Sequence, residues 1–221
     1  MTSANKPDIR AYVGSTGSGK GVSVERYLKA QKPDRLVVWD PIGEWVSLGR
    51  EVKDLAGLAR AMKAPKFKLV YRPGDDFKAY PGKFAEFCQM VYAAACLGQL
   101  SGLRTTVLVE ELADVTQPSF APPSWGRCCT SGRHQGLQII ACTQSPAFVD
   151  KKFLGNCTYI RCFTLREAPH RKRMAQALDV PETQMAALQT VEDDRGVSIT
   201  YYERDFRSGE AGQDTIRLTR R

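Results

Sequence analysis

A glycine-rich segment near the amino terminus carries the residue types that bind phosphate. It directly follows a short apolar run at positions 9–13, and an amphipathic segment follows it. Glycines let the backbone curl so that several N–H groups point at phosphate oxygens, and a lysine adds a positive charge. The pattern predicts a P-loop in which Lys20 neutralises the β- and γ-phosphates of ATP. The expected nucleotide-binding residues of this segment are Gly14, Ser15, Thr16, Gly17, Ser18, Gly19, Lys20, Gly21 and Val22.

Position 21 departs from the usual P-loop pattern. Gly21 stands where a Ser or Thr hydroxyl normally ligates Mg²⁺. Either Ser18 or Ser23 then supplies a hydroxyl, or water fills the missing position, because Mg²⁺ commonly retains several waters. The sequence therefore leaves open how the metal is held.

Two adjacent acids end a second apolar run. Residues 105–111 read Thr-Thr-Val-Leu-Val-Glu-Glu, the form of a Walker B strand. Ligands of open parallel sheets bind beyond the carboxyl ends of the strands. We expect Glu110 to lie near Mg²⁺ and Glu111 to position or deprotonate the attacking water. The structural alternative is a solvated acidic helix start, which the helix dipole favours.

Short β-branched runs alternate with segments of helical periodicity along the chain. Strands are expected at 9–13, 36–39, 69–71, 105–109, 137–142 and 159–163. Helices are expected at 20–31, 55–63, 83–97, 124–133, 167–178 and 182–188. This alternation predicts an α/β fold with a mainly parallel central sheet flanked by helices. Residues 197–202 and 215–218 are expected to form an antiparallel hairpin appended to that sheet, and the pairs Pro73-Gly74 and Pro81-Gly82 are expected in loops.

Length and composition fit one globular domain. The 221 residues have 43% hydrophobic and 25% charged side chains, which argues against a disordered or fibrous chain. We expect a single domain over 1–221, with a core at about 9–190 and a β extension at about 191–221. No apolar run approaches the roughly 20 residues of a membrane span, and the seven cysteines show no metal-ligand spacing, so a protein made in the cytosol with reduced thiols is expected.

Two further motifs carry a resemblance to a known family. Residues 36–45 read Leu-Val-Val-Trp-Asp-Pro-Ile-Gly-Glu-Trp, and residues 132–146 end an apolar strand in Thr-Gln-Ser-Pro. With the P-loop, the Walker B strand and the strand at 156–163, they resemble the FtsK–HerA superfamily of P-loop ATPases over about residues 9–178. Because the chain is short, it most resembles the genome-packaging ATPases of tailless icosahedral viruses with an internal membrane.

The resemblance assigns roles to further residues. Gln144 is the expected sensor of the γ-phosphate or attacking water, although it could instead cap the next turn. Asp40 and Glu44 are expected to orient water or metal ligands beside the nucleotide, and a turn built on Asp-Pro-x-Gly explains Asp40 equally well. Ring motors also use an arginine from a neighbouring subunit, for which the candidates are Arg133 first, then Arg161 and Arg171.

The net charge of +8 suggests a polyanionic partner. Two basic clusters either track a DNA backbone or form solvated faces. The first comprises Arg161, Arg166, Arg171, Lys172 and Arg173, and the second comprises Arg60, Lys63, Lys66 and Lys68.

The expected function is ATP- and Mg²⁺-dependent translocation of double-stranded DNA by a homo-oligomeric ring, with six subunits as the expected number. As a viral genome-packaging motor it would act in the host cytoplasm and at the packaging vertex of the virion, beside capsid or membrane-associated packaging proteins. The alternatives are a Zot-like or conjugation-type assembly ATPase, a small P-loop kinase, and a scaffold subunit that binds nucleotide without hydrolysing it.

Overall fold

The fold is built around one ten-stranded sheet in a computed structural model that describes residues 7–219. The spatial order is β10-β9-β7-β1-β6-β5-β2-β4-β3, and β8 pairs with β9 off this path. The strands are β1 (Asp8–Val13), β2 (Arg35–Trp39), β3 (Arg50–Val52), β4 (Phe67–Tyr71), β5 (Thr105–Val109), β6 (Leu137–Thr143), β7 (Tyr159–Cys162), β8 (Thr190–Asp193), β9 (Gly196–Asp205) and β10 (Ala211–Thr219). All pairs from β7 to β3 are parallel, and those of β9 are antiparallel. The predicted α/β P-loop fold class is confirmed.

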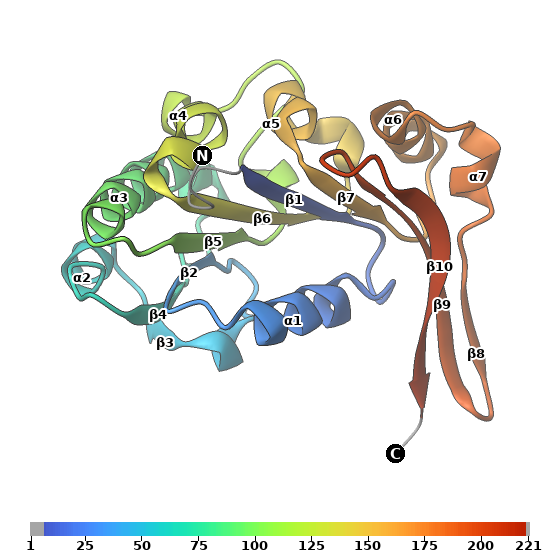
Figure 1. Cartoon of the computed structure of the whole chain (residues 1–221), viewed down its shortest axis with the longest axis horizontal. Helices are drawn as coiled ribbons and strands as arrows, with labels where there is room; N and C mark the ends of the chain where they lie inside the picture. Colours follow the sequence, from blue (N-terminus) through green and yellow to red (C-terminus); the bar gives the residue numbers. More distant parts are fainter. Residues whose placement is uncertain (1–6, 220–221) are drawn as a thin grey trace.

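Helices cover both faces of the sheet (Figure 1). They are α1 (Lys20–Gln31), α2 (Leu55–Ala61), α3 (Tyr80–Leu100), α4 (Pro123–Ser131), α5 (Lys151–Asn156), α6 (Ala168–Leu178) and α7 (Glu182–Ala186). On one face, α3, α4 and α5 bury a core around Trp39, Phe84 and Trp125. On the other, α1 packs Val24 and Leu28 over the sheet. The central strands are therefore buried on both sides, as their continuous apolar runs predict.

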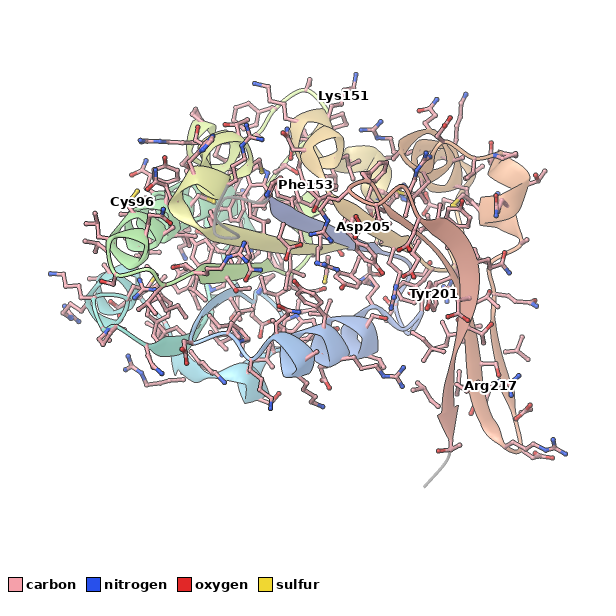
Figure 2. The ribbon with its side chains drawn as sticks, in the orientation of Figure 1. Cys96, Lys151, Phe153, Tyr201, Asp205 and Arg217 are labelled. Atoms are coloured by element: carbon pink, nitrogen blue, oxygen red, sulfur yellow. The ribbon has the colours of Figure 1, made fainter. Side chains whose placement is uncertain are left out.

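The carboxyl-terminal strands extend well beyond the body of the molecule. In Figure 1, β8, β9 and β10 run past the end of α1 as a twisted ribbon. Figure 2 shows Tyr201 where this ribbon joins the body and Arg217 farther along it. The expected hairpin is confirmed, but β9 and β10 are longer than the runs 197–202 and 215–218, because an antiparallel ladder also accommodates polar residues on its solvent face.

Several element boundaries differ from the sequence expectation. The structure adds the short strands β3 and β8 and the helix α5 to the expected elements. Pro81 was expected in a loop, yet it lies in the first turn of α3. Proline is accepted there because the first helical N–H groups have no intrahelical partner. All seven cysteines are free thiols, and six of them are buried.

Within residues 7–219, no helix is both long enough and apolar enough to cross a bilayer.

Candidate functional site

The P-loop connects β1 to α1 and is anchored to the neighbouring strands. The Gly14 N–H donates to Thr143 O at 3.1 Å, and the Ser15 N–H donates to Thr164 O at 2.9 Å. Gly17 and Gly19 have φ values of +73° and +97°, which only glycine adopts without strain. The loop therefore ends against the carboxyl ends of β6 and β7 with α1 pointing its amino terminus into the site.

Lys20 begins α1 and folds back over the loop. Its Nζ donates to Gly14 O at 2.6 Å and to Ser15 O at 3.1 Å. Its side chain is buried against the P-loop backbone, with 8% of the residue exposed. These two carbonyl oxygens hold the Lys20 ammonium group beside the P-loop, within reach of a phosphate bound there.

A cleft of about 280 Å³ opens above the P-loop. Most of the expected nucleotide-binding and catalytic residues meet there. Its walls are formed by Thr16, Gly17, Ser18, Gly19, Lys20, Gly21, Val22, Glu44, Trp45, Glu110, Gln144, Val197, Ile199 and Leu218. Four of these residues, Trp45, Val197, Ile199 and Leu218, lie outside the site predicted from the sequence. The aromatic of the 36–45 motif and the alternation of residues 197–202 were the signals that could have found them.

Glu110 lies at the carboxyl end of β5 and is only 2% exposed. Its backbone N–H continues the ladder by donating to Trp39 O at 2.9 Å. Burial raises the pKa of Glu110 to about 7, against the opposing effect of the Trp45 indole N–H, and the nearby Glu44 carboxylate raises it further. A cation in the cleft would relieve this unfavourable burial of negative charge.

Glu111 has a left-handed backbone, with φ of +44°. Such a backbone conformation is costly for any residue other than glycine and is often found at functional sites. Its Oε1 accepts from Thr143 Oγ1 at 2.7 Å, and both its oxygens accept from the Gln144 N–H. Burial raises the pKa of Glu111, and these two donors oppose that rise. The turn thus fixes Glu111 beside Gln144.

Gln144 follows β6 and contacts the P-loop directly. Its Oε1 accepts a hydrogen bond of 2.7 Å from Thr16 Oγ1. A smaller hollow beside this contact is lined by Ser15, Thr16, Gln144, Ser145, Arg166, Glu167 and His170. Arg166 is exposed there, and the sequence reasoning had placed it only in a basic cluster.

Asp40 is fully buried and is not part of the cleft wall. Its Oδ1 accepts from the N–H groups of Gly43 and Glu44, and its Oδ2 accepts from that of Trp45. Both oxygens are used in building the loop, which is the turn alternative left open by the sequence. Asp40 therefore reaches the cleft only through the residues it positions, whereas Glu44 lines it directly.

The three candidate arginines lie in different surroundings. Arg133 is exposed before β6, at the edge of the sheet opposite to Gln144. Arg161 is held within its own subunit, by two bonds to Glu203 Oε2 and one from Nη1 to Ser23 Oγ at 3.1 Å. Arg171 Nη1 donates to the carbonyls of Leu165 and Arg166. Of the three, Arg133 alone is an exposed residue.

The cleft offers few ligands for a metal ion. No group of three or more His, Cys, Asp or Glu side chains gathers as a metal site in the described part of the chain. Ser18 Oγ is buried without a hydrogen-bond partner among these residues, whereas the hydroxyl of Ser23 is engaged by Arg161. One carboxylate and one free hydroxyl fit Mg²⁺, which is usually held by one or two protein groups together with phosphates and water.

Comparison with known proteins places the chain in a family. No family model matches the sequence. Protein P9 of Pseudoalteromonas phage PM2 is 30% identical over 182 residues, which cover 81% of this chain and 78% of that protein. The genome packaging NTPase B204 of Sulfolobus turreted icosahedral virus 2, solved with ATP-gammaS, superposes with a TM-score of 0.72 at 18% identity, covering 96% of this chain and 98% of B204. The bacterial conjugative coupling protein TrwB superposes with a TM-score of 0.59 at 11% identity, covering 98% and 79%.

The two structural likenesses establish the fold, and the P9 likeness establishes kinship over most of both chains. The chain therefore belongs to the family of phage PM2 protein P9 and shares its fold with the genome packaging NTPase B204.

Proposed function

We propose that this protein is an ATP-driven translocase of double-stranded DNA that packages a viral genome as a subunit of a homo-oligomeric ring. The observation that carries the proposal is the meeting of Lys20, Glu110 and Gln144 around one cleft at the carboxyl edge of the sheet. Kinship with protein P9 and the shared fold of B204, described as a genome packaging NTPase, support the packaging role.

Lys20 and the P-loop backbone would bind the phosphates. The Nζ now bonded to Gly14 O and Ser15 O would turn to the β- and γ-phosphate oxygens, where it compensates negative charge. The N–H groups of the loop and the positive end of α1 add to this field. ATP is thus held by the charge of its phosphates.

Glu111 would position the water that attacks the γ-phosphorus. The water oxygen forms a bond to phosphorus, the bond to the ADP leaving oxygen breaks, and Glu111 accepts the water's proton. A carboxylate with a raised pKa is better suited to hold that proton at neutral pH. Gln144 would orient the same water through its amide, as glutamines do in related phosphoryl transfer.

Glu110, together with Ser18, would hold Mg²⁺ among the phosphate oxygens and water molecules. The ion supplies positive charge next to the phosphates. The raised pKa of Glu110 in the protein alone supports this role, since a buried carboxylate gains most from a cation.

The carboxyl-terminal hairpin would cover the nucleoside. Val197, Ile199 and Leu218 form an apolar wall of the cleft, and Ile199 lies close over Gly19. Apolar side chains favour the flat, weakly polar faces of a nucleobase.

DNA would be held by its backbone, because a motor must pass every base in turn. Arg60, Lys63, Lys66 and Lys68 are all exposed and close in sequence. Each phosphate contact releases counterions, so affinity should fall steeply as salt rises. Between 50 and 200 mM salt, the DNA affinity of a protein that contacts several phosphates falls on the order of a thousandfold. A DNA affinity that does not change over this range would argue against a DNA channel.

The deciding experiment measures phosphate release from ATP and Mg²⁺ with and without double-stranded DNA. Hydrolysis stimulated by DNA of any sequence supports the translocase. Transfer of phosphate to a small molecule identifies a kinase, and binding without release identifies a scaffold subunit. DNA-independent hydrolysis in a membrane-bound complex would favour the Zot-like or conjugation-type alternative.

The proposed assembly is a ring, with six subunits as the expected number. It would work in the host cytoplasm at the packaging vertex of the virion, in contact with capsid or membrane-associated packaging proteins. Light scattering with and without ATP measures the subunit number directly, and a protein that hydrolyses ATP efficiently as a monomer would contradict the ring.

A further inference from the structure

Trp45 lies between the Walker B acid and the unusual glycine of the P-loop. Its indole Nε1 donates to Glu110 Oε2 at 2.7 Å, and only 3% of the residue is exposed. A Cβ atom added to Gly21 would lie 3.9 Å from Cη2, at the far edge of the same ring. One side chain thus touches both the acid and position 21, where the usual P-loop has a hydroxyl.

The loop that carries Trp45 is itself fixed by hydrogen bonds, and it holds the indole ring in place. The buried carboxylate of Asp40 accepts three backbone N–H groups, the last of them from Trp45 at 2.9 Å. Gly43 permits this tight turn with a φ of +85°. Trp45 is therefore fixed before any nucleotide enters, and its N–H fixes one oxygen of Glu110.

We propose that Trp45 is a positioning residue, which orients the Glu110 carboxylate toward the phosphates beside a P-loop that has no hydroxyl side chain at position 21. The inference rests on the proposed ATPase function and deepens it. The usual P-loop site holds Mg²⁺ with an acid and a hydroxyl, whereas this site has Glu110 and Gly21 at those positions. We infer that the Trp45 indole, rather than a P-loop side chain, sets the geometry of Glu110.

The first test is Trp45→Phe, which keeps an aromatic ring and removes the N–H donor. A hydrogen bond to a charged group is worth about a tenfold effect or more, so we expect kcat to fall about tenfold, with the KM for ATP changed less than about threefold. A second readout needs no turnover. The ratio of ATP affinities measured in Mg²⁺ and in EDTA, using a fluorescent ATP analogue, should shrink in Trp45→Phe.

Trp125→Phe is the matched control. The Trp125 indole also donates to a buried carboxylate, Asp150 Oδ2, at 3.0 Å, but it lies in the core on the opposite face of the sheet. The two variants remove the same bond type at buried sites, so both should lose stability. Trp125→Phe should keep the wild-type kcat and the wild-type Mg²⁺ response.

The second test is a cycle between positions 45 and 21. Ordinary P-loop chemistry predicts that Gly21→Ser adds a metal ligand and raises activity. Our inference predicts that Gly21→Ser raises kcat little in the wild type, because the indole N–H already orients Glu110, and raises it more in the Trp45→Phe background, where Glu110 has lost that donor. The double variant should exceed the product of the single effects by at least about threefold.

The outcomes separate this inference from the proposed function. If the wild type hydrolyses ATP while Trp45→Phe retains its kcat and Mg²⁺ response, or if Trp125→Phe matches its losses, the positioning role is overturned. Should Trp45→Phe fail to fold, Gly21→Ser alone decides, and an activity well above that of the wild type overturns the role. If the wild type binds ATP without hydrolysing it, the proposed function fails, and the Mg²⁺ affinity ratio still decides the role of Trp45.

Discussion

Thr16 and Gln144, which are 128 positions apart in the sequence, are joined by a hydrogen bond of 2.7 Å from Thr16 Oγ1 to Gln144 Oε1. The bond connects the P-loop to the end of β6 across the mouth of the cleft. A phosphate bound to the loop would compete for the Thr16 hydroxyl and release the amide of Gln144. The contact thus offers a direct route by which nucleotide binding could reach Gln144, the proposed sensor.

Gln144→Ala should lower kcat by roughly a hundredfold while changing ATP affinity little, since the amide acts on the attacking water rather than on the bound nucleotide. Thr16→Val should have a smaller effect, because it removes only the partner. Steady-state phosphate release measures both. Gln138→Ala is the matched control, since Gln138 lies on β6, the strand that Gln144 follows, and bonds to Thr106 and Asp8. An equal loss of kcat in that control would contradict a sensor role.

Lys20→Ala should abolish ATP hydrolysis, because no other positive side chain lies within the P-loop sequence from Gly14 to Lys20. Isothermal titration should also show weaker ATP binding. Lys29→Ala is the control, since this exposed lysine of the same helix makes a surface ion pair with Glu25. Wild-type hydrolysis by Lys20→Ala would show that the P-loop assignment is wrong.

Glu111→Gln should separate binding from turnover. The amide keeps the shape of the side chain and can still accept from Thr143 Oγ1, but it cannot hold a proton from the attacking water. We expect kcat to fall roughly a hundredfold or more with ATP affinity preserved, as measured by single-turnover kinetics and equilibrium binding. Retained turnover would move the water-positioning role to Glu110 or Glu44.

The stability of the nucleotide-free protein should depend on the ionisation of Glu110. Its pKa is about 7 in the fold, against an ordinary value of 4.5, so the folded state binds more protons than the unfolded state between these two pH values. The free energy of unfolding should therefore decrease as pH rises through this window, by up to roughly 1.4 kcal/mol per pH unit, and level off above it.

Urea unfolding of the wild type and Glu110→Gln at pH 5, 6, 7 and 8 checks this expectation. The variant cannot ionise at this position, so its free energy of unfolding should increase relative to that of the wild type as pH rises. A constant difference in the free energy of unfolding between the two proteins over this range would show that Glu110 has its ordinary pKa in the fold.

A mixing experiment tests whether Arg133 acts on a neighbouring subunit. Lys20→Ala and Arg133→Ala should each be inactive alone, and their mixture should recover activity, because some interfaces then join an intact P-loop to an intact arginine. Activity per subunit should also rise with protein concentration as rings form. Normal assembly without recovery would reject Arg133.

Arg166→Ala provides the contrasting case. Arg166 shares a hollow with Gln144 of its own subunit. If Arg166 acts on the nucleotide of its own subunit, mixing Arg166→Ala with Lys20→Ala should not restore ATPase activity, because no subunit then carries both Lys20 and Arg166. Recovery of activity by this mixture would instead make Arg166 the residue that acts between subunits.

The order of the main strands and helices, and most of the residues from the P-loop that line the cleft, can be predicted from the sequence. The apolar runs of the central strands are buried on both faces, so their pattern is readable without the fold. The P-loop glycines and the acid pair are equally local, because their function depends on backbone conformation and on the end of a strand. These features predicted the sheet and brought Lys20 and Glu110 to one cleft at its carboxyl edge, whereas Glu111 lies beside Gln144 and is not among the lining residues of that cleft.

Which distant residues complete the cleft depends on how the whole chain packs. Val197, Ile199 and Leu218 reach the P-loop because β9 pairs antiparallel with β7 and runs on past α1. No local pattern encodes that distance. The same holds for Trp45, whose contact with Glu110 spans 65 positions. Side chains that meet through sheet order and strand length are fixed by packing of the whole chain, which a motif at one position cannot reveal.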